Sequence, residues 1–79
     1  MKECTSNEPI LLTIGAQWKV FDEVFTCVKR DDQMGWESYI IRIESPTHPD
    51  SPKFLRVTGK NEVKAFSFHQ TYNNFKGIL

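Results

Sequence analysis

The clearest alternation of apolar and polar positions lies in residues 36–44, where aromatic and β-branched residues dominate and glycine and proline are absent. One row of this segment is apolar and consists of Tyr39, Ile41 and Ile43. The other row is mixed and consists of Trp36, Ser38, Ile40, Arg42 and Glu44. A period of two predicts a β-strand with one buried face and one partly exposed face. We expect this strand to be the structural centre of the chain.

Shorter segments with strand-like composition lie on both sides of it and are separated by turn-forming residues. Their ranges are 10–14, 17–21, 24–30, 53–58 and 62–66. Glycine marks the bend after the first of them, and a five-residue connection before Trp36 fits a hairpin. Residues 45–52 contain three prolines, each of which would remove a donor from a sheet ladder, so we predict a loop there.

The C-terminal segment allows two interpretations. Four apolar residues recur there at helical spacing, namely Phe68, Tyr72, Phe75 and Leu79. Ser67 followed three residues later by Gln70 matches a capping box, whereas Asn73 and Gly77 are poor helix formers. We predict a short helix or 3₁₀ turn around residues 68–75, with an extended strand through Phe68 as the alternative.

Five or six short strands at regular spacing predict an all-β fold, either a small barrel or a sandwich. Residues 14–20 and the closing segment 66–68 are similar to landmark positions of SH3-like barrels, and the resemblance covers about residues 10–70. It implies a five- or six-stranded antiparallel barrel and no particular function. An OB-like barrel is the main alternative. The polar residues 1–9 predict a flexible N-terminal tail, and residues 10–79 a single barrel domain.

The charges are balanced overall but unevenly distributed. The chain has ten Lys and Arg residues and ten Asp and Glu residues, and this balance argues against a classical basic nucleic-acid binder. Residues 1–52 carry nine acids and five bases, whereas residues 53–79 carry one acid and five bases. The two parts therefore have net charges of −4 and +4, and such a bipolar molecule can be steered onto a charged partner.

The residues that usually carry chemistry are scattered. The thiols and imidazoles, Cys4, Cys27, His48 and His69, are each about twenty residues apart, unlike the paired spacings of zinc modules. The acid pairs 22–23 and 31–32 fall in predicted turns, where solvated acids are ordinary. We therefore predict no enzyme activity, no metal, no cofactor and no small-molecule substrate. Two cysteines and the absence of an apolar leader or membrane span indicate a cytoplasmic protein without a membrane partner.

The basic and aromatic residues of the C-terminal third, together with the mixed face of the central strand, form the predicted binding surface. Its residues are Trp36, Arg42, Lys53, Arg56, Lys60, Lys64, His69, Tyr72 and Asn73. Trp, Tyr and Arg are enriched at the centres of protein interfaces, so we predict a module that binds another protein, such as the small regulators or inhibitors carried by phages or mobile elements. Binding of single-stranded DNA or RNA through stacked aromatics and cations is the alternative. The pattern does not determine an oligomeric state.

Overall fold

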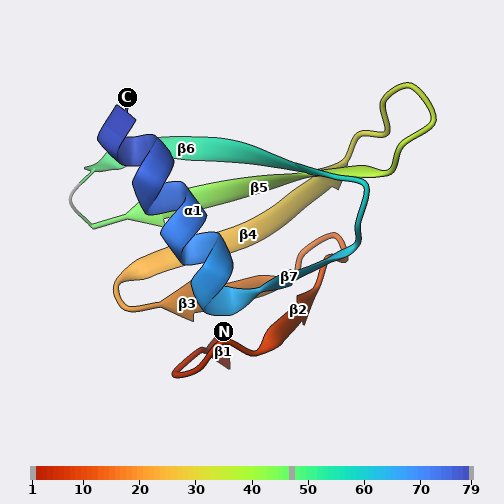
Figure 1. Cartoon of the computed structure of the whole chain (residues 1–79). Coiled ribbons are helices and arrows are strands. Elements are labelled where there is room, and N and C mark those ends of the chain that lie inside the picture. The colour runs from red at the N-terminus through yellow and green to blue at the C-terminus, as the bar shows by residue number, and fades with distance from the viewer. Residues whose placement is uncertain (1, 47, 79) are drawn as a thin grey trace.

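The computed structural model describes residues 2–46 and 48–78, excluding the side chains of residues 48, 49 and 75–78. The larger sheet has the order β1-β3-β4-β5-β6, with the bounds Lys2–Glu3, Gln17–Val20, Glu23–Arg30, Ser38–Ser45 and His48–Thr58. A second sheet pairs β2 (Pro9–Leu11) with β7 (Glu62–Lys64). Helix α1 (Ala65–Ile78) follows β7 directly and runs across the sheet (Figure 1). The chain is thus mostly β with one C-terminal helix.

The sheets do not close into a barrel. Strands β1 and β6 are the two edges of the larger sheet, and within the described residues β2 and β7 pair only with each other. The pairing of β1 with β3 is parallel, whereas the other described pairs are antiparallel. The SH3-like antiparallel barrel that the sequence predicts is therefore not confirmed, although the β-rich fold is.

Strand β5 confirms the central role that its alternation predicts. It lies between β4 and β6, and its apolar row of Tyr39, Ile41 and Ile43 is buried. Ile41 has Cys27 opposite it on one neighbouring strand and Leu55 on the other. The burial of this row fixes the register, because a slip of one residue would turn it toward solvent.

The prediction of a loop over residues 45–52 is wrong at Ser45, which belongs to β5, and from residue 48 onward, because β6 begins there. This strand is an edge of the sheet, where a residue that cannot donate on the outer side is tolerated. The prolines at 49 and 52 also fall in an irregular stretch, since the register with β5 shifts between Ile43 and Ser45. A sheet edge with a bulge therefore accommodates both prolines.

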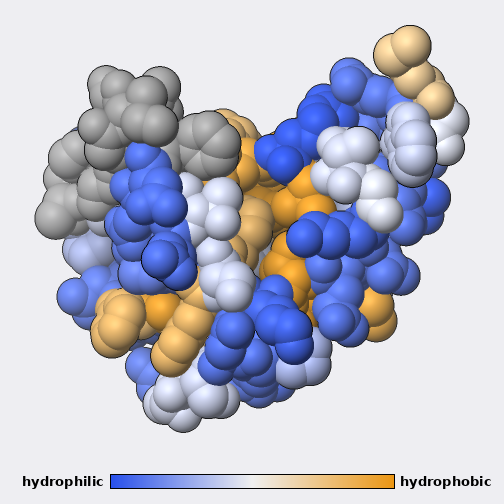
Figure 2. All heavy atoms as spheres, viewed as in Figure 1, coloured by the Kyte–Doolittle hydropathy of each residue, from blue (hydrophilic) through white to orange (hydrophobic). Residues whose placement is uncertain are grey.

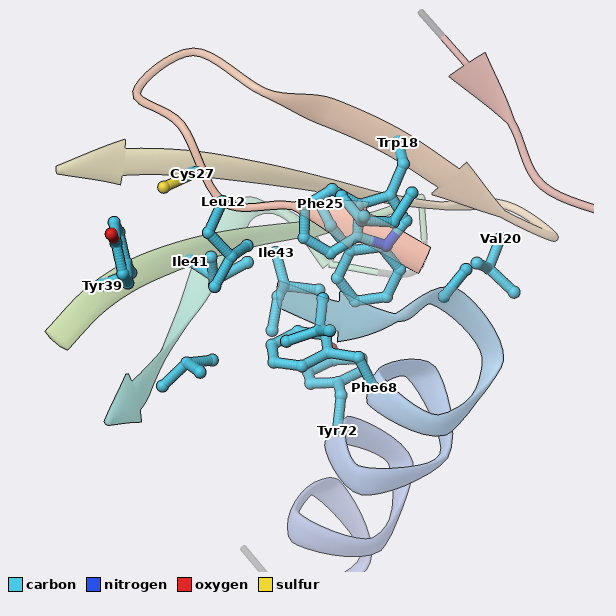
Figure 3. Close-up of a cluster of buried hydrophobic side chains, with 14 of the residues drawn as sticks. Leu12, Trp18, Val20, Phe25, Cys27, Tyr39, Ile41, Ile43, Phe68 and Tyr72 are labelled. Atoms are coloured by element: carbon cyan, nitrogen blue, oxygen red, sulfur yellow. The ribbon is translucent and has the colours of Figure 1, made fainter. Parts of the chain in front are cut away.

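The core contains an aromatic cluster between α1 and strands β3 and β4, formed by Trp18, Phe25, Phe68 and Tyr72 (Figure 3). Trp18 and Phe25 are stacked with ring centroids 5.4 Å apart, and the ring of Phe68 meets both edge-on. The edge of Tyr72 also meets Phe25. Aromatic pairs in these geometries stabilise a fold by about 0.5–1.5 kcal/mol each beyond the area that they bury.

The N-terminal segment differs from the flexible tail that we predict for residues 1–9. Strand β1 pairs with β3, and Cys4 is buried, with its N–H donating to Lys19 O. Asn7 Oδ1 accepts hydrogen bonds from the backbone N–H groups of Phe66 and Ser67. Asn7 thus caps α1 from far away in the sequence, and the helix begins at residue 65, before the predicted 68. The side chain of Phe75 and all of Leu79, which belong to the predicted apolar spacing, lie outside the described part of the chain.

Candidate functional site

A groove lies between β6, β7 and α1, with a volume of about 410 Å³. Its apolar floor is formed by Leu55, Val57, Val63 and Phe68. Its remaining lining residues are Arg56, Thr58, Lys60, Lys64, Ser67 and Thr71. Figure 2 shows a hollow with an apolar floor and a mostly hydrophilic rim between the helix and the protruding β4–β5 hairpin. A concave apolar surface with few polar groups is typical of a binding site.

The wall that β6 contributes to the groove includes the edge of its backbone. Gly59 N–H donates to Glu37 O at 2.8 Å, which continues the β5–β6 ladder beyond the end of β6. In an antiparallel ladder the backbone groups of successive residues face opposite sides. Leu55 and Val57 therefore share the orientation of Gly59 toward β5, whereas the amide and carbonyl of Arg56 and Thr58 face away from β5. This explains how four consecutive residues, 55–58, line the groove.

Lys60 and Lys64 supply positive charge at the rim. Both residues are exposed, and no carboxylate of the described residues lies within 4.0 Å of either amine. Lys53 lies on the same face of β6 as Leu55 and Val57 by strand alternation, but it is not part of the lining. The groove therefore brings together two of the predicted lysines and leaves the third at a distance along β6.

The guanidinium of Arg56 is engaged on the opposite face of the sheet. Its Nη2 lies 2.9 Å from Asp31 Oδ2, and its Nη1 donates to Asp31 O and Ser38 Oγ. The hydrogen bond from Arg56 holds the pKa of the Asp31 carboxyl below its ordinary value. Arg56 thus lines the groove through its backbone, and its charge fastens β6 to the end of the β4–β5 hairpin.

Trp36 lies beside Gly59, just beyond the end of β6. It is 64 % exposed, and the nearest neighbour that a Cβ on Gly59 would meet is the indole of Trp36, at 3.8 Å. The turn that precedes it has positive φ at Met34 (51°) and Gly35 (83°), and Trp36 N–H donates to Gln33 O. Two successive residues with positive φ fit the tight turns that close β-hairpins. The turn therefore positions an exposed indole beside Gly59, which lies between the lining residues Thr58 and Lys60 in the sequence.

Arg42 lies on the face of the sheet that is turned away from the helix. Its Nε is 3.0 Å from Glu44 Oε1, and it is directly opposite Phe54, which is 57 % exposed. Arg42 and the groove therefore belong to different surfaces. The sequence could not separate them without knowing which face of the strand α1 covers.

His69, Tyr72 and Asn73 lie on a different side of α1 from the groove. His69 Nε2 is 2.7 Å from Oε1 of Glu23, and both side chains are largely buried. Asn73 Nδ2 donates to His69 O and lies 3.2 Å from both ring nitrogens. Tyr72 is buried in the aromatic cluster, where desolvation and then Glu23 raise the pKa of its phenol. These three residues of the predicted binding surface therefore do not line the groove with Lys60 and Lys64.

Glu23 is a residue whose placement the sequence did not predict. We expected an exposed acid in a turn, but it begins β4, is buried, and lines a second pocket of about 270 Å³ with His69 and Asn73. Phe21, whose φ is 54°, lies at the mouth of this pocket with its ring 5.4 Å from that of His69. A positive φ turns the chain sharply between β3 and β4 and so brings Glu23 under the helix.

An acid that is hydrogen-bonded to a histidine is an arrangement that also occurs in nucleophilic catalysis, where a nucleophile lies beside the histidine. Cys4 and Cys27 are both buried, burial raises the pKa of both thiols, and no described contact joins either to His69. Nucleophilic catalysis needs a nucleophile within hydrogen-bond reach of the base. Among the described side chains, no three His, Cys, Asp or Glu come together as a metal site. The Glu23–His69 pair acts here as a bridge between β4 and α1.

Comparisons of the chain with protein families, with curated proteins and with solved structures found no significant match. Within the described residues no helix has the length and apolar character that are needed to cross a bilayer.

Proposed function

We propose that the protein is a non-enzymatic binding module that holds a segment of a partner protein in the groove between β6, β7 and α1. The observation that carries the proposal is the combination of an apolar floor with two rim lysines that have no carboxylate within 4.0 Å among the described residues. An apolar side chain of the partner would fill the groove, and acidic groups beside it would meet the lysines.

The placement of the aromatic residues favours a protein over a nucleic acid. Single strands bind through exposed rings on which successive bases stack. Phe68 and Tyr72 are buried in the core. Of the exposed rings, that of Trp36 lies beside Gly59, that of Phe54 on the other face of the sheet, and that of Phe21 at the pocket of Glu23 and His69. A row of stacking rings beside the rim lysines is therefore lacking among the described side chains, whereas a socket for an aliphatic side chain is present.

The test uses two variants that change the groove in different ways. Thr71→Leu places a larger apolar side chain in the groove. The substitution removes one described side-chain hydrogen bond, which Thr71 Oγ1 donates to Ser67 O. Lys60→Glu combined with Lys64→Glu reverses the charge of the rim. Lys29→Glu is the matched control, because Lys29 is exposed on β4 and is not part of the lining.

We expect a stoichiometric protein partner to be captured by the wild type and by Lys29→Glu, and to be lost with both groove variants while circular dichroism shows an intact fold. Partner capture that is equal for all four proteins would overturn the proposal. Recovery of nuclease-sensitive material in place of a protein would support the DNA or RNA alternative.

A further inference from the structure

The groove also indicates how a partner segment would bind. Resting on the proposed function, we propose that the segment is an extended, acidic stretch of the partner that adds as a β-strand to the free edge of β6. By free edge we mean the side of β6 that faces away from β5, which has no strand partner among the described residues.

The free edge provides an ordered set of backbone groups inside the groove. The amide and carbonyl of Arg56 and Thr58 face away from β5, and both residues line the groove. Unpaired backbone donors and acceptors on an exposed strand are a template for a further strand. Four residues of β6 would offer a segment about 13 Å long for pairing, at about 3.3 Å per residue.

The opposite wall of the groove also has outward-facing backbone groups. Two backbone hydrogen bonds extend the β2–β7 ladder: Leu12 N–H donates to Asn61 O at 2.7 Å, and Ala65 N–H donates to Glu8 O at 2.9 Å. They show that the backbone groups of residues 61 and 65 face β2. Val63 therefore faces β2, and the N–H of Lys64 faces away from it. Strands β6 and β7 are consecutive, yet they do not pair with each other in the described structure. A strand of the partner would lie between these two edges.

The side chains around the free edge define the chemistry of the segment. In an added strand, alternate residues would point toward the floor of Leu55, Val57, Val63 and Phe68. The remaining positions near the β6–β7 turn would meet Lys60 and Lys64. The residues that line the groove include no acid, so the charge of Lys60 and Lys64 favours a negatively charged segment. A segment that alternates valine or isoleucine with glutamate or aspartate meets both requirements.

The direct test is a titration of the full chain with a labelled peptide that alternates valine with glutamate, followed by amide exchange measured by NMR. We expect the amides of Arg56 and Thr58 to become protected on binding at least about tenfold, because each would gain a hydrogen-bond acceptor. The amides of Leu55 and Val57 already face β5, so their exchange should change much less. Equal protection at all four positions, or at none of them, would overturn the strand-addition proposal.

Two modified peptides provide a second readout. In each peptide, two backbone amides at alternate positions are replaced by esters, which removes two N–H donors without adding bulk. One peptide carries the esters at odd positions and the other at even positions. Loss of two hydrogen bonds should weaken binding by about tenfold or more in at least one of the peptides. If both ester peptides bind as tightly as the parent, the segment is held by its side chains alone, and the strand-addition proposal is wrong while the proposed function stands.

Further probes separate the failure of this inference from the failure of the proposed function. A peptide with lysine in place of glutamate should bind at least about tenfold more weakly. If the alternating peptide does not bind while Thr71→Leu still abolishes capture of a protein partner, the groove is used but not by an extended acidic strand. Binding of a single-stranded oligonucleotide, or a dimer formed through the same amides, would overturn the inference by assigning the free edge to another occupant.

Discussion

The two flanks of α1 are built very differently. The flank that faces β3 and β4 is closed by interlocking rings, with Phe68 against both Trp18 and Phe25. The flank that faces β6 leaves the groove open, although it belongs to the same helix and lies over the same sheet. The difference follows from the size of the side chains, because Trp and Phe fill the space between helix and sheet, whereas Leu55 and Val57 do not reach across it.

A small domain rarely leaves apolar space open without a reason. With 79 residues, the chain buries only about 60–65 % of the surface that its unfolded form exposes, so every unfilled position weakens a small core. Ser67 and Thr71 occupy the helix positions beside the groove, where larger apolar residues would close it. We interpret the closed flank as a source of stability and the open flank as the proposed binding surface.

The largest expected effect is the loss of an aromatic ring from the closed flank. Phe25→Ala should lower the free energy of unfolding by about 3–5 kcal/mol, because it leaves a cavity among fully packed rings. The matched variant on the open flank is Val57→Ala, which we expect to cost only about 1–1.5 kcal/mol, because the deleted methyl groups border an open groove. Urea denaturation measures the free energy of unfolding of both variants. Equal losses of this free energy would mean that the two flanks contribute equally to stability.

The bridge between Glu23 and His69 fastens the helix on the closed side. A double-mutant cycle with Glu23→Gln and His69→Gln should give a coupling free energy of about 1–2 kcal/mol, since both groups are largely buried. Asp22→Asn, at the exposed neighbouring position, is the control and should show no coupling with His69→Gln. A coupling near zero would show that ring packing alone holds α1 in place.

The cap supplied by Asn7 orients the start of α1, which forms one wall of the groove. Asn7→Ala should lower stability by about 1 kcal/mol, because two helix N–H groups lose their acceptor. Ser6→Ala, at an adjacent exposed position, should change it by less than about 0.5 kcal/mol. Thermal unfolding followed by circular dichroism distinguishes the two, and an unchanged midpoint for Asn7→Ala would contradict the capping role.

The smallest expected effect is at the ion pair behind the open flank. Because the pKa of Asp31 is lowered in the fold, its contribution to stability is present above the unfolded value of about 3.9 and is lost as the pH falls through the lower folded value. Asp31→Asn should therefore slightly lower the free energy of unfolding at pH 7. The difference in this free energy between the variant and the wild type should shrink below about pH 4. Asp50→Asn, which removes an exposed acid from β6, serves as the control in urea titrations at both pH values.

The strands could be predicted because their signal is local. The alternation in residues 36–44 and the strand-like composition of residues 17–21 and 24–30 are local signals, and Trp18, Val20, Phe25 and Cys27 in these segments are buried. The helix was predicted three residues short at its start, because its cap comes from Asn7, nearly sixty residues earlier. The barrel was predicted from the number and spacing of strands, which do not specify whether the edges of a sheet meet.

The candidate site was predicted only in part, because its members come from three elements. The sequence indicated a basic C-terminal third, and Lys60 and Lys64 do line the groove. It could not show that Arg56 turns its charge to Asp31, or that His69 turns toward Glu23, since the residues of these pairs are 25 and 46 positions apart. The strand through residues 48–52 was missed because proline is disfavoured in a central strand but not at an edge.

The two buried thiols give the molecule a pair of internal reporters of motion. Cys4 lies next to the short edge strand β1, whereas Cys27 lies in β4, which has partner strands on both sides. A buried thiol reacts with an alkylating reagent only when its surroundings open. Detachment of an edge requires less free energy than separation of an internal strand, so Cys4 should be labelled first. The order in which the two thiols react would then describe how the fold opens from its N-terminal edge inward.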